Sequence, residues 1–112
     1  MRKIERQLIT ALNTPGQKLK SSNTQVRWSD DQSFVEVLLH GHIIASINYA
    51  TSVMVLSSCG WKTTTTKSRL NAILSDLVPG ARIFAKSYEW FITGDDGKTA
   101  EFSKVENVAF SF

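Results

Sequence analysis

The sequence predicts an α+β fold, in which a single domain forms an antiparallel meander sheet packed by two amphipathic helices, in the order αββββαβββ. Apolar residues recur at helical spacing near the N-terminus and again at residues 70–77, whereas between these segments they alternate as in strands. Short turn sequences separate the alternating runs. Each helix has only one apolar stripe, so it must cover a sheet face or pack on the other helix.

The first helix is predicted from one apolar side and one cationic side. Its apolar side consists of Ile4, Leu8, Ala11 and Leu12. Lys3 and Arg6 point the opposite way. Pro15 and Gly16 end the helix, because proline cannot continue its hydrogen bonds and glycine permits a left-handed exit. The polar segment 16–23 is predicted to be a loop.

Four strands are predicted after this loop. They cover residues 24–28, 34–39, 42–49 and 53–58. In the first of them Val26 and Trp28 alternate with polar residues. His40 and Gly41 have the sequence of a tight hairpin turn between the second and third strands. Consecutive strands joined by short turns predict an antiparallel meander.

The second helix is predicted at residues 70–77, where Leu70, Ile73 and Leu74 share one side and Pro79 and Gly80 follow. Three more strands are then expected. They cover residues 82–87, 90–93 and 99–102. The closing residues 105–112 are expected to form either another edge strand or a tail.

Composition fits one globular domain without a membrane span. The chain has 112 residues, of which 42% are hydrophobic and 21% charged. No apolar run approaches the roughly 18 residues that a spanning helix needs. Cys59 is the only cysteine, which excludes an internal disulfide and suits a reducing compartment. We therefore expect a soluble, cytoplasmic protein.

Positive charge is concentrated in two segments. Residues 1–20 and residues 61–87 each carry five Lys or Arg and one acid, whereas the other two segments carry more acids than bases. This alternation fits an ordinary solvated surface, and it also fits a local cationic face.

The segment 61–74, WKTTTTKSRLNAIL, has a structural and a functional interpretation. In the structural one, residues 62–64 finish a strand and Thr65 or Thr66 caps the following helix. In the functional one, the helix start and its hydroxyls bind an anion, and the cations supply counter-charge. The functional interpretation explains why cations occur where they oppose the helix dipole, at Arg2 and Lys3 as well as here.

The functional interpretation predicts contact with nucleic acid or another polyanion through both helix starts. The predicted contact residues are Arg2, Lys3, Arg6, Lys62, Thr65, Thr66, Lys67, Ser68 and Arg69. Trp61 could stack on a base, although a tryptophan beside a glycine is also typical of a core. The prediction requires the two helix starts to lie close together.

Other kinds of site are not supported. The string GWKTTTTKS lacks a glycine directly before Lys67, so it is not an NTP-binding loop. His40, His42 and Cys59 include potential metal ligands, but a polar hairpin and an inert thiol account for them better. We expect no metal, no cofactor and no catalysis.

The C-terminal strands provide an alternative binding surface. Trp90 and Phe91 are adjacent on a strand, so their rings should face opposite sides of the sheet. With Tyr88, Phe102 and the terminal phenylalanines, this part could expose an apolar face. A protein partner, such as a host protein, or a homodimer is the alternative to nucleic acid.

Three segments resemble a group of small, uncharacterised proteins of tailed bacteriophages, including phages of marine bacteria. They are NTQV at residues 23–26, VLLHGHIIA at residues 37–45 and GWKTTTTKSRLNAIL at residues 60–74. The resemblance implies a viral accessory protein that acts in the cytoplasm of an infected bacterial host. It implies no catalytic residue, and it does not decide between a nucleic-acid and a protein partner.

Overall fold

The computed structural model describes residues 2–21, 23–60, 62–94, 96–102 and 108–112. It contains two helices, α1 (Lys3–Leu12) and α2 (Thr64–Leu77). A six-stranded antiparallel sheet has the order β1-β2-β3-β4-β5-β9. Its strands are β1 (Leu19–Ser21), β2 (Thr24–Trp28), β3 (Phe34–Leu39), β4 (His42–Asn48), β5 (Val53–Leu56) and β9 (Val108–Ser111). The predicted α+β class and meander are confirmed.

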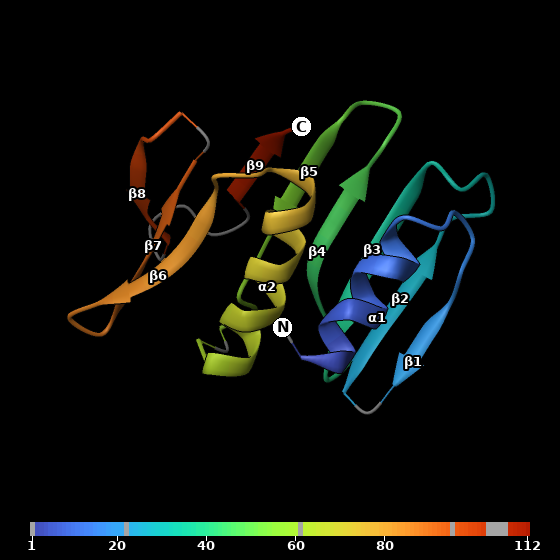
Figure 1. The fold of residues 1–112 in the computed structure, drawn as a ribbon, viewed down its shortest axis with the longest axis horizontal. Coiled ribbons are helices and arrows are strands. Elements are labelled where there is room, and N and C mark those ends of the chain that lie inside the picture. The colour runs from blue at the N-terminus through green and yellow to red at the C-terminus, as the bar shows by residue number, and fades with distance from the viewer. Residues whose placement is uncertain (1, 22, 61, 95, 103–107) are drawn as a thin grey trace.

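A second sheet follows α2. It is antiparallel and contains β6 (Arg82–Lys86), β7 (Glu89–Thr93) and β8 (Thr99–Glu101). Figure 1 shows α1 and α2 side by side on one face of the six-stranded sheet, with the smaller sheet beyond α2. The prediction of one sheet is therefore corrected to two, because the chain leaves the large sheet at α2 and starts a separate hairpin.

Two strands lie outside the predicted element order. The predicted loop 16–23 contains β1, which pairs Leu19 with Val26 at the edge of the large sheet. In the closing segment, residues 108–111 form an edge strand, one of the two forms expected, and pair Ser111 with Val53, while residues 105–107 lie outside the described residues. β1 forms in a local hairpin with β2, whereas β9 pairs with the chain-distant β5. The order αββββαβββ therefore lacks one strand before α2 and one at the end.

One hydrophobic cluster joins the helices and both sheets. The helices bury Leu8, Ala11, Leu12, Leu70, Ile73 and Leu74, and the large sheet buries Val26, Val35, Val37, Ile47, Met54 and Leu56. These are the apolar positions that the helical and alternating spacings predict. Trp90 of β7 and Phe102, which directly follows β8, belong to the same cluster, with ring centroids 5.8 Å apart.

The hairpin between β3 and β4 turns at His40 and Gly41, as the sequence predicts. Both residues have positive φ, 51° for His40 and 80° for Gly41. Positive φ at both central positions is typical of the two-residue hairpin turn whose twist matches that of the flanking strands. The His40 N–H donates to the Asn23 carbonyl at 2.8 Å. The turn is thereby held against the β1–β2 connection, beside the start of α2.

Candidate functional site

The two helices run parallel, so their N-terminal ends lie at the same end of the molecule. In the first turn of α1, the Glu5 carboxylate accepts hydrogen bonds from Ser68 and Arg69 near the start of α2. At the opposite end, Asn13 Nδ2 donates to Asp76 Oδ2 at 2.9 Å. The geometric condition of the polyanion prediction is met, because the positive ends of both helix dipoles are neighbours.

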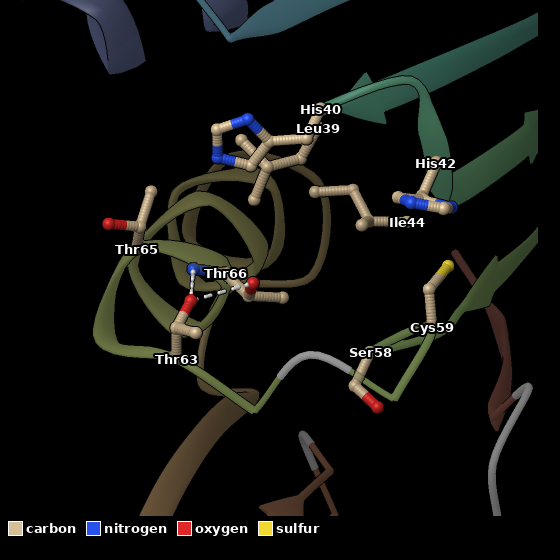
Figure 2. Close-up of a pocket in the computed structure, with 9 residues that line it drawn as sticks. All are labelled: Leu39, His40, His42, Ile44, Ser58, Cys59, Thr63, Thr65 and Thr66. Carbon is tan, nitrogen blue, oxygen red and sulfur yellow. Dashed lines mark hydrogen bonds between the residues drawn. The ribbon is translucent and has the colours of Figure 1, made fainter.

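Thr63 caps the start of α2. It adopts an extended backbone, and its hydroxyl accepts the Thr66 N–H at 3.2 Å (Figure 2). The sequence-based cap at Thr65 or Thr66 is therefore wrong, as is the strand at residues 62–64. In a run of four threonines any member can cap, and packing of the leucines that follow decides which one does.

Most of the predicted cations are at the surface. Arg2, Lys3, Arg6 and Lys62 are exposed, and Lys67 is half-buried. We call the surface formed by these five cations, Arg2, Lys3, Arg6, Lys62 and Lys67, the helix-start surface. The structure therefore keeps these positions accessible to a polyanion.

Two hollows contain four of the five cations of the helix-start surface. A shallow groove across the two helices, of about 390 Å³, brings Arg2 together with Lys67. On the other flank of α1, a hollow of about 420 Å³ is lined by Lys3 and Arg6. The charges thus flank the first turn of α1 on both sides.

Arg69 does not belong to this surface. Only 4% of the residue is exposed, and its guanidinium donates to Glu5 Oε2 at 2.8 Å and to Thr24 Oγ1 at 3.1 Å. The prediction that Arg69 is a contact residue is therefore wrong: its charge is buried, and a buried charge needs an internal partner, which is Glu5. Thr66 is only 1% exposed, so it too is removed from the set of contact residues, because a ligand cannot reach it.

Glu5 is the acid in the middle of these cations. Burial alone would raise the pKa of its carboxyl, but hydrogen bonds from Ser68 and Arg69, with the charge of Arg69, hold that pKa below its ordinary value. The carboxylate therefore stays ionised and neutralises Arg69. Ser68, a predicted neutral donor, gives its hydroxyl hydrogen to Glu5.

A cavity that the sequence did not predict lies between the β3–β4 hairpin and the start of α2. Its volume is about 270 Å³, and we call it the His40 cavity. It is lined by Leu39, His40, His42, Ile44, Ser58, Cys59, Thr63, Thr65 and Thr66. In Figure 2 the His40 ring and Leu39 lie on one side, His42 and Cys59 on another, and Ile44 between them. Thr65 is thus placed at this cavity.

Among the described residues, no group of three or more His, Cys, Asp or Glu is placed so that it could hold a metal ion. The Cys59 thiol donates to the Ile43 carbonyl at 2.9 Å. No sequence signal could have located this site, because the hairpin and the threonines meet only through tertiary packing. Trp61, the predicted stacking residue, lies outside the described residues.

The C-terminal aromatics divide between core and surface. The rings of Trp90 and Phe91 have different surroundings, as predicted, since Trp90 is buried against Phe102 while Phe91 is half-buried and stacks on Phe84 at 5.6 Å. Tyr88, at the tip of the β6–β7 hairpin, is fully exposed. Tyr88 at the tip and the half-buried Phe84 and Phe91 therefore give this hairpin an accessible aromatic surface.

In a comparison with protein families, the family described as Kyanoviridae Gp96 protein, a phage protein family, matches residues 1–109. Comparisons with curated proteins and with solved structures find no match. Within the described residues, neither helix is long and apolar enough to cross a membrane.

Proposed function

Because the chain belongs to the Kyanoviridae Gp96 protein family, we propose that it serves a phage in the cytoplasm of the infected host, by binding nucleic acid through the helix-start surface. The observation that carries this proposal is the parallel packing of α1 and α2, which gathers two helix starts and their cations at one end. The binding is non-enzymatic.

The arrangement of charge favours a phosphate backbone as the partner. The cations of the helix-start surface oppose the dipoles of their own helices, so each costs its helix a few tenths of a kcal/mol. Within the predicted contact set, Arg69 forms an ion pair with Glu5 and is buried inside the molecule. Arg2 and Lys67, in contrast, line an open groove. A polyanion lying across this groove would offset that cost.

Charge reversal tests the proposal. Lys67→Glu and Arg2→Glu are expected to abolish binding of a fluorescent oligonucleotide of about 16 nucleotides at low salt, measured by anisotropy. Lys86→Glu, at an exposed position of β6, changes the net charge equally and serves as the control. Equal losses in all three variants would mean that only net charge matters, and the proposal would be withdrawn.

A protein partner bound at the β6–β7 hairpin is the second candidate. The Arg82 guanidinium lies 5.2 Å from the centroid of Phe84, which stacks on Phe91, and Tyr88 projects from the tip. Exposed aromatic and arginine side chains are enriched in interfaces. Sedimentation at several concentrations tests the homodimer, which predicts concentration-dependent mass that Tyr88→Asn abolishes.

A further inference from the structure

We propose that the His40 cavity receives one unstacked base of a single-stranded nucleic acid while Lys20 and Lys67, the latter of the helix-start surface, hold the neighbouring phosphates. This inference rests on the proposed function and names its ligand more closely. A base in a duplex is stacked and paired, so only a single strand can present one to a cavity.

The chemistry of the cavity suits a flat ring better than a phosphate. Among the described residues that line it there is no Lys or Arg. Leu39 and Ile44 contribute buried apolar side chains, 4% and 2% exposed, and the exposed His40 supplies an aromatic ring. Aromatic rings stack on bases of any sequence, and hydroxyls such as that of Thr65 can meet base edges.

The size of the cavity limits the occupant. Its volume of about 270 Å³ lies just below the range of roughly 300–1,000 Å³ that is usual for drug-sized ligands. The cavity therefore suits a single small ring system, as in one base, rather than a whole dinucleotide.

Two hollows with cations adjoin residues of the cavity. One, of about 520 Å³, shares His40 with it and is lined by Lys20 and Gly41. The other is the groove between the helices, lined by Glu5 and Lys67 and by Thr64, the neighbour of the cavity residues Thr63 and Thr65. A strand that crosses from Lys20 to Lys67 would pass the mouth of the cavity with a phosphate on each side.

The test compares strands and variants that keep charge constant. Wild-type protein is expected to bind a single strand of about 16 nucleotides more tightly than a sugar-phosphate strand of equal length without bases. His40→Asn removes the ring at a position with φ of 51°, which asparagine tolerates. It is expected to weaken binding about 5- to 150-fold without changing the salt dependence.

Gln32→Asn is the matched control, because it places asparagine at another exposed turn position of positive φ, 62°, which precedes β3 whereas His40 follows it. It should leave affinity unchanged. Thr65→Phe fills the cavity from the helix side and should weaken binding as His40→Asn does. Thermal melts confirm that each variant is folded, and the comparison with the strand that lacks bases needs no variant at all.

The two proposals fail differently. If the wild type binds neither strand at low salt, the proposed function is wrong and the inference falls with it. If it binds both strands equally, and His40→Asn is neutral while Lys67→Glu is not, nucleic-acid binding stands and the base-binding role of the cavity is overturned.

Discussion

Glu5→Gln should destabilise the fold strongly, because it removes the only charge that Arg69 meets at hydrogen-bond distance among the described residues. The two side chains are 6% and 5% exposed, and their charged atoms are 2.8 Å apart. Removing one partner of a buried ion pair typically costs about 3–5 kcal/mol, since the other charge stays buried. The whole fold of a chain of this length is stabilised by roughly 6–17 kcal/mol.

The expected loss translates into a measurable melting shift. With an unfolding entropy of about 2.1 cal/mol/K per residue, each kcal/mol lowers the melting temperature by about 4 °C, so Glu5→Gln should lower it by about 12–20 °C. Circular dichroism during heating, and urea titration, measure the two quantities. Both should also show that Glu5→Leu combined with Arg69→Met recovers most of the loss, because no charge is then buried.

The exposed pair Arg27–Glu36 provides the control. Its charged atoms are also 2.8 Å apart, but its side chains are 53% and 21% exposed. Glu36→Gln should therefore cost at most about 1 kcal/mol, or about 4 °C. If Glu5→Gln and Glu36→Gln had equal effects, the reasoning that Arg69 depends on an internal counter-charge would be refuted.

Four further outcomes are expected. The folded pKa of Glu5 is below its unfolded value, so its contribution to the free energy of unfolding is present above about pH 4.3 and is lost as pH falls through the folded pKa. In Glu5→Gln, the free energy of unfolding should therefore fall less steeply with decreasing pH. Thr63→Ala should cost about 1 kcal/mol by removing the cap of α2, whereas Thr64→Ala should be nearly neutral in the same urea titration. Asn71→Ala should cost about 1–3 kcal/mol, because its amide bonds both the N–H and the carbonyl of one β6 residue, and hydrogen exchange should quicken there. Tyr88→Gly should raise the melting temperature by about 4 °C or more, since glycine relieves about 1–2 kcal/mol of left-handed strain.

The parts of the fold that follow local patterns could be predicted from the sequence. Leu8 and Leu12 at helical spacing are buried, and Pro15 follows the end of α1 as expected. The turn at His40 and Gly41 also follows from residue type and from the alternating strands beside it. In each case a short-range signal decides the structure.

Two edge strands could not be predicted from local patterns. Residues 19–21 have too little alternation to indicate a strand, and they become one by pairing with β2 in a short hairpin. The closing segment has the same ambiguity until β5 offers it an open edge. A single sequence contains no information on which edge stays open.

The sequence indicates which residues near the helix starts are cationic, but not which of them are buried. Arg2, Lys3 and Lys67 are accessible, as their positions near helix starts indicate. Arg69 occupies the same stretch of sequence, yet it faces Glu5 and Thr24 inside the molecule. Which cation is buried depends on how α1 lies against α2, and helical spacing within one helix does not specify that.

Salt dependence of single-strand binding tests the central claim most directly. If all five cations of the helix-start surface neutralise phosphates, log K should fall against log salt with a slope of about −3.5, so affinity should drop about 100-fold between about 50 and 200 mM salt. Lys67→Ala should make the slope shallower by about 0.7. A flat salt response, or an unchanged slope in Lys67→Ala, would contradict the account.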